Sequence, residues 1–180
     1  MKILTNLVLG LMLMASGEAI AQSSMKNPVS YHLKNGITLI VAENTGFGKI
    51  YASVESESHV SNANYSAFDQ LDEHLNLNAK KQLSETFAPL TPKSPKITFR
   101  KGKANIASDI QSFSETFAIL ASTIQHVNCK DEKKDHFFRN QFVPSKLVIT
   151  IAGDIKQSEA KRLVNQYFGT MQDSDFLAAQ

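Results

Sequence analysis

Cysteine is almost absent from this chain of 180 residues: Cys129 is the only one, so no internal disulfide can form. Excess charge is also small, with a formal net charge of +2 at pH 7, which is too slight to indicate a nucleic-acid partner. The basic cluster at 100–103 is short, lacks interleaved aromatic residues and is typical of a solvated loop. Beyond residue 21, no run approaches the roughly 20 apolar residues of a membrane-spanning helix. Cys129 is best explained as a buried apolar thiol, with an intermolecular link or an incidental residue as alternatives.

The first 21 residues have the pattern of a secretory signal peptide. Lys2 supplies the positive start, an apolar run covers 7–15, and Ala19-Ile20-Ala21 gives an A-x-A cleavage site. The alternative is a membrane anchor, for which the apolar run is short. We therefore predict a periplasmic or secreted protein, with no membrane span after cleavage.

The rest of the chain has the length of one domain. We predict a flexible lead-in at 22–30, a single domain at 31–172 and a C-terminal tail at 173–180. The sequence shows no internal repeat and no low-complexity segment.

Strand patterns occur early in the domain. Asn35-Gly36 is a strong hairpin-turn signal, followed by a strand rich in β-branched residues at 37–42. A second strand is predicted at about 50–57, paired antiparallel with the first, and one face of the pair should be buried. A third, short strand is expected at 97–99, after a proline-containing connector at 88–96.

Helical patterns alternate with these strands. A helix of about four turns should begin near Tyr65, and an apolar stripe from Ile110 to Val127 predicts a second helix. The nearly all-apolar run at 147–152 predicts a central strand. A final helix follows at about 157–168, with Gly169 at its C′ position. The predicted fold is α+β, a mostly antiparallel sheet covered on one side by two or three helices.

The first helix carries a near match to a metal-binding motif. The inverted zinc motif H-x-x-E-H places two histidines on one helical face and a glutamate beside the second histidine. The corresponding residues here are Gln70-Leu71-Asp72-Glu73-His74. The glutamate and the second histidine are present, but glutamine occupies the first ligand position.

Three blocks of the sequence together resemble the pitrilysin/insulinase zinc metallopeptidases, which include the mitochondrial processing peptidases. The blocks are Leu33-Lys34-Asn35-Gly36-Ile37 with the strand after it, the helix Phe68–Leu75, and Phe142-Val143-Pro144-Ser145 continuing through Gly153-Asp154 to Gly169. They occur in the order of that family and span most of the chain. The resemblance implies a shortened half of such an enzyme. The shortening falls between the zinc helix and the last strand, where active members carry a further glutamate ligand.

The resemblance assigns His74 as a metal ligand, Glu73 as the general base and Gln70 as the degenerate ligand position. A catalytic zinc needs three protein ligands and an open position for water, and an amide oxygen is a poor substitute for imidazole. The third ligand has no clear match. The candidates by residue type are Glu85, Glu115, His59, His126 and His136.

No other catalytic pattern is present, because the chain lacks a G-x-S-x-G elbow, a P-loop and a G-x-G-x-x-G turn. We therefore expect an exported, non-catalytic pitrilysin-like protein (a pseudoenzyme) that needs no cofactor and binds a peptide or a protein. One such partner would be an active pitrilysin-like peptidase subunit. The alternative is a minimal zinc-dependent endopeptidase that uses the degenerate motif. A third reading is a truncated remnant without a selected function.

Overall fold

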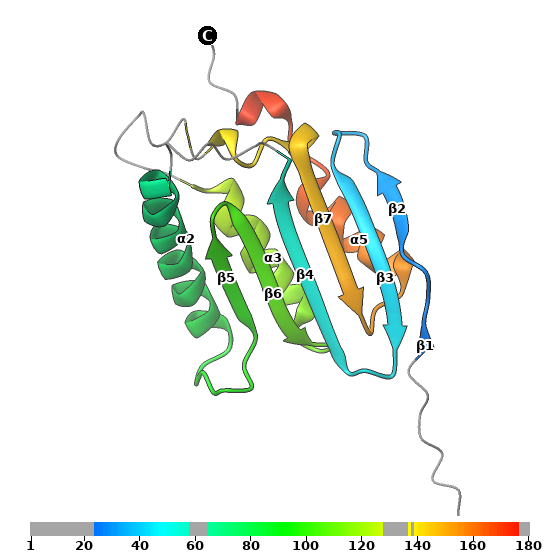
Figure 1. The fold of residues 1–180 in the computed structure, drawn as a ribbon. Helices are drawn as coiled ribbons and strands as arrows, with labels where there is room; N and C mark the ends of the chain where they lie inside the picture. The colour runs from blue at the N-terminus through cyan, green and yellow to red at the C-terminus, as the bar shows by residue number, and fades with distance from the viewer. Residues whose placement is uncertain (1–23, 58–64, 128–136, 138, 177–180) are drawn as a thin grey trace, which may run out of the picture.

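The computed structural model describes residues 24–57, 65–127, 137 and 139–176. Within these ranges, one mixed sheet of seven strands lies against three helices, with α3 and α5 behind the sheet and α2 beside its β5 edge (Figure 1). The strands are β1 (Ser24–Met25), β2 (Val29–His32), β3 (Thr38–Thr45), β4 (Lys49–Ser56), β5 (Lys96–Arg100), β6 (Lys103–Asp109) and β7 (Leu147–Gly153). The helices are α2 (Tyr65–Thr86), α3 (Phe113–Gln125) and α5 (Gln157–Phe168), with short 3₁₀ turns at Pro144–Lys146 and Asp173–Asp175.

The strand order is β1-β3-β7-β4-β6-β5, and β2 also pairs with β3. Among the described strands, β3 and β7 run parallel and the other pairs are antiparallel. The predicted α+β fold with a mostly antiparallel sheet is therefore confirmed. Among the described residues, no helix is long and apolar enough to cross a membrane.

The predicted pairing of the strands at 37–42 and 50–57 is wrong. Strand β7 lies between them, so that Ile151 is opposite both Val41 and Ala52. A nearly all-apolar strand is most stable where neighbours flank both its edges. Burial of β7 therefore overrides the local pairing of two strands that are close in sequence.

The sheet has one face covered by helices and one uncovered face. On β4, the side chains of Ile50, Ala52 and Val54 are buried beneath the helices, while Tyr51 and Ser53 alternate with them on the other side. The same alternation runs through β5 and β6. We call the uncovered side the open face.

Strand β6 and the start of α3 differ from the sequence prediction. The chain forms a strand at 103–109, and α3 begins at Phe113, so Ile110 is 50% exposed and lies outside the helix. The Asp109 Oδ1 atom accepts a hydrogen bond from the Ser112 backbone N–H at 2.8 Å, which stabilises the turn into α3. The alanine and serine content of β6 gives only a weak strand signal in sequence.

The segments at both ends of the domain carry regular structure. Strands β1 and β2 begin within the expected lead-in at 22–30 and pair with β3. The expected tail starts with the 3₁₀ turn at 173–175 and a buried Phe176, 5% exposed. Helix α2 is 22 residues long, longer than about four turns. Gly169 ends α5 with a φ of −67°, so it does not take the left-handed conformation that its predicted C′ role implies.

Candidate functional site

The three residues of the degenerate zinc motif, Gln70, Glu73 and His74, lie on α2. Gln70 and Glu73 are exposed, while His74 is half-buried. The His74 Nε2 atom lies 3.1 Å from the Nδ2 atom of Asn78, one turn further along the same helix. This contact places the ring nitrogen against a neighbouring amide of its own helix.

The buried acid of this motif is Asp72, which is 8% exposed. Its carboxylate accepts hydrogen bonds from the backbone N–H groups of Lys101 and Gly102, the latter at 3.5 Å. These two residues form the tight turn between β5 and β6, with φ values of 52° and 71°. Asp72 therefore holds the β5–β6 hairpin against α2.

One turn further along α2, Asn76 binds the outer edge of β5. Its Nδ2 atom donates to the Phe99 carbonyl and its Oδ1 atom accepts from the Phe99 N–H, both at 2.9 Å. An edge strand leaves such backbone groups without a strand partner, and the Asn76 amide supplies one. Asp72 and Asn76 are four residues apart, a spacing on one helical face that could have been found in the sequence.

Burial raises the pKa of the Asp72 carboxyl, and this effect exceeds the lowering by the Lys101 and Gly102 amides. A carboxyl whose pKa is higher in the folded than in the unfolded chain binds its proton more tightly in the folded state. The proton-linked part of its contribution to stability is therefore fully present below the unfolded pKa of about 3.9 and is lost as the pH rises through the folded value. The hydrogen bonds from the Lys101 and Gly102 amides are a separate contribution that the ionised carboxylate also makes.

We expect Asp72→Ala to lower the free energy of unfolding by about 1–3 kcal/mol at neutral pH, because two turn amides lose their acceptor. The matched control is the exposed neighbour: Glu73→Ala should change stability by no more than about 0.5 kcal/mol. Urea unfolding of both variants checks this. At acidic pH, urea unfolding should show a larger difference in the free energy of unfolding between wild type and Asp72→Ala. Equal effects of the two variants would contradict the clamping role of Asp72.

The described residues do not fit a catalytic zinc site at the motif. Glu85 lies eleven residues after His74 on the same helix, which is about 16 Å along the axis. Glu115 is exposed in the first turn of α3, and the exposed His126 places its Nδ1 atom 2.9 Å from the Ser122 carbonyl oxygen. Throughout the described ranges, no three side chains of His, Cys, Asp or Glu are close enough to hold a metal together. His59, Cys129, His136 and the segment 1–21 lie outside the described residues.

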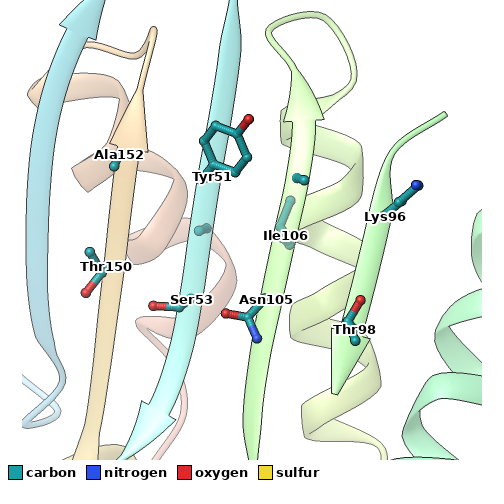
Figure 2. A pocket seen from close by; sticks show the side chains of 10 residues that line it. Tyr51, Ser53, Lys96, Thr98, Asn105, Ile106, Thr150 and Ala152 are labelled. Carbon is teal, nitrogen blue, oxygen red and sulfur yellow. The ribbon is translucent and has the colours of Figure 1, made fainter. Parts of the chain in front are cut away.

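A second candidate site is a hollow of about 340 Å³ on the open face, above β4, β6 and β5. Figure 2 shows its lining side chains: Tyr51 and Ser53 on β4, Asn105 on β6, and Lys96 and Thr98 on β5. Ala152 and Thr150 of β7 border its other side. This site could not be predicted from the sequence, because its residues come from four strands that are widely separated along the chain.

No protein-family model matches the sequence, and no curated protein matches it. Solved structures do resemble its fold. A protease from Helicobacter pylori matches with a TM-score of 0.63 and 12% identity, over 86% of this chain and 52% of that protein. An M16-like peptidase from Alicyclobacillus acidocaldarius matches with a TM-score of 0.58 and 9% identity, over 81% and 50%. The first half of the periplasmic protease PqqL from Escherichia coli gives 0.61 and 8%, over 86% and 48%.

This likeness shows the fold: the chain has the architecture found in part of the M16-like, pitrilysin-type peptidases. The chain spans about half the length of these three structures.

Proposed function

We propose that this protein is an exported, non-catalytic M16-like domain that acts by binding a protein or peptide partner. The observation that carries the proposal is that α2 uses polar side chains to bind the β5–β6 hairpin and carries an incomplete set of zinc-binding residues. Asp72 and Asn76 are bound to the β5–β6 hairpin, whereas the motif offers His74 as its one imidazole, with glutamine at position 70.

The chemistry of the motif supports the absence of catalysis. His74 is the one imidazole that the motif offers, and its Nε2 atom lies against Asn78. The amide of Gln70 is a weak zinc ligand compared with imidazole. Glu73 could act as a general base only on a water that a firmly held zinc activates. Loss of the metal site therefore removes the function of this glutamate as well.

Two further observations support export and binding. Residues 1–21 have the signal-peptide pattern, and one structure of similar fold is a periplasmic protease. Another structure of similar fold, the ferredoxin protease FusC, was solved in complex with Arabidopsis ferredoxin. It matches with a TM-score of 0.57 and 10% identity over 87% of this chain and 25% of that protein. A domain of this architecture can therefore belong to a protein that holds a polypeptide.

The test is the zinc content of the purified protein after equilibration with zinc and dialysis, measured by atomic absorption beside a quenched-peptide hydrolysis assay. We expect wild type to retain far less than one zinc per chain and to hydrolyse no peptide. Gln70→His should raise zinc retention, because it restores two histidines on one helical face. It should not restore hydrolysis, because the third ligand is still missing.

The control variants are His74→Ala and Glu73→Ala, neither of which should change the zinc content of wild type. Zinc retention of about one ion per chain that disappears in His74→Ala would contradict the proposal. Hydrolysis that disappears in Glu73→Ala would establish the alternative, a minimal zinc peptidase.

A further inference from the structure

A second hollow of about 330 Å³ lies further along the strands that line the hollow of Figure 2. On β5 the lining passes from Lys96 and Thr98 to Arg100, and on β6 from Asn105 to Lys103. On β4 it passes from Ser53 to Glu55. The two hollows therefore follow the same three strands, end to end. We call the pair of hollows the trough.

The charge of the trough is mostly positive. Its lining includes four basic residues and a single acidic one, Glu55. Glu55 Oε2 lies 2.8 Å from Lys103 Nζ, so this carboxylate offsets one of the four positive charges. Of the other basic residues of the lining, Lys96 and Arg100 lie on the open face of β5. The trough therefore has an excess of positive charge in a chain whose net charge is only +2.

A buried acid lies beneath the β5–β6 turn. Asp72 is 8% exposed, and its carboxylate accepts the turn amides of Lys101 and Gly102. At the opposite end of β4 and β6, Lys49 and Asp109 pair in register and carry opposite charges. The Asp72 carboxylate interacts electrostatically with Arg100, whereas Lys49 and Asp109 offset each other.

The floor of the trough is formed by small side chains. Ala107, Ala152 and Ser53 lie on the open face, and Ala107 is exposed. Tyr51, which is 48% exposed, stands at one end as an aromatic wall (Figure 2). Small floor residues let a ligand backbone approach the sheet, and Thr98 and Asn105 offer side-chain hydrogen bonds beside it. Strand β5 spans about 17 Å, the length of some five extended residues.

We propose that the trough binds an extended, acidic segment of a partner polypeptide. Carboxylates of the segment would bind Lys96 and Arg100, since guanidinium and carboxylate form strong paired hydrogen bonds. The main chain of the segment would lie over Ala107 and Ala152. This inference rests on the proposed binding function and names the class of partner. A nucleic acid is a poorer fit, because the trough has one aromatic side chain on which a base could stack and a short basic track.

The test is fluorescence anisotropy of the full protein with labelled peptides of equal length, in which threonine alternates with glutamate, lysine or glutamine. We expect the glutamate peptide to bind most tightly and its affinity to fall with added salt. The double variant Lys96→Glu/Arg100→Glu should weaken its binding roughly tenfold or more. The matched control is Lys34→Glu/Lys93→Glu, which changes the net charge equally at exposed sites outside the trough and should weaken it by less than about twofold.

A second variant tests shape rather than charge. Ala107→Leu fills the floor with an exposed side chain and should also weaken the glutamate peptide roughly tenfold. Equal losses in the trough and control double variants would overturn the inference in favour of a general charge effect. A single-stranded oligonucleotide could also bind more tightly than the glutamate peptide, with an affinity that Ala107→Leu does not change. That result would overturn the inference and assign the trough to polyanions. A dimer in sedimentation that Lys96→Glu/Arg100→Glu dissociates would assign the trough to a second copy of the chain.

The same peptides separate this inference from the proposed function. Preferred binding of the lysine or glutamine peptide would leave a binding domain in place and overturn only the acidic class of partner. Hydrolysis of any of the peptides would overturn the non-catalytic proposal, while the loss of affinity in the trough variants would still report on the trough.

Discussion

Gly153→Ala should lower the free energy of unfolding by about 3–5 kcal/mol, enough to unfold a marginally stable domain. Gly153 has a φ of 128°, and a Cβ atom there would lie 2.2 Å from the Lys49 carbonyl oxygen and 3.0 Å from Ile50 Cα. Both obstacles are backbone atoms, so no side-chain rotation can relieve the clash. Denaturant unfolding followed by circular dichroism measures the effect.

The matched control is Gly46→Ala. Gly46 also has a positive φ, 86°, but a Cβ atom there would meet nothing within 4 Å. Its replacement should therefore cost only the strain of a left-handed backbone, about 1–2 kcal/mol. If both alanine variants lost the same stability, the close approach of β7 to β4 would not be the reason for glycine at 153.

The surroundings of Gly153 explain the size of the expected effect. The next residue, Asp154, donates its backbone N–H to the Lys49 carbonyl at 2.9 Å. Its Oδ2 atom accepts hydrogen bonds from the Gly46 and Gly48 N–H groups at 2.9 and 3.0 Å. The end of β7 thus binds the loop that joins β3 to β4. Displacing Gly153 would disturb the strand that lies between these two.

Phe117→Ala is the second large effect, with an expected loss of about 3–5 kcal/mol in the free energy of unfolding. Phe117 has 0% exposure and contacts three aromatic rings on the covered side of the sheet. Its centroid is 5.6 Å from Phe113, 5.4 Å from Phe168 and 6.2 Å from Tyr167. Removing its ring leaves a cavity where α3 meets α5. Thermal and urea unfolding of the purified variant measure the loss.

Ile110→Ala is the control for Phe117→Ala, because the two residues belong to the same apolar stripe in the sequence. Ile110 is 50% exposed and precedes α3, so its truncation should change stability by no more than about 0.5 kcal/mol. A loss comparable to that of Phe117→Ala would mean that the stripe is buried from Ile110 onward, as its periodicity alone predicts.

Much of the secondary structure followed from local pattern. The stripe that includes Phe117 lies on a helix, the apolar run at 147–152 is a central strand, and Asn35-Gly36 turns β2 back onto β3. Each of these features depends on residues within a few positions of one another, and the periodicity of an element is a local property. The α+β class and the covered face of the sheet follow from the same patterns.

The sequence also located the helix that bears the degenerate motif, but it could not assign roles within it. Periodicity does not distinguish the exposed Glu73 from the neighbouring Asp72, whose carboxylate accepts the amides of Lys101 and Gly102. That distinction depends on the hairpin at 96–109, of which the sequence analysis recognised only the strand at 97–99. The sequence signal of β6 was weak because its alanine and serine residues have little preference for strands compared with β-branched and aromatic residues.

By itself, then, the sequence determined the types and approximate places of most elements, the sheet with one buried face, and the absence of a complete zinc motif. Tertiary structure decided that β7 lies between β3 and β4, that Asp72 and Asn76 hold the hairpin, and that four strands combine to form the trough. Pairings between distant segments depend on how much apolar surface the whole chain can bury. That quantity is a property of the assembled sheet and of no single segment.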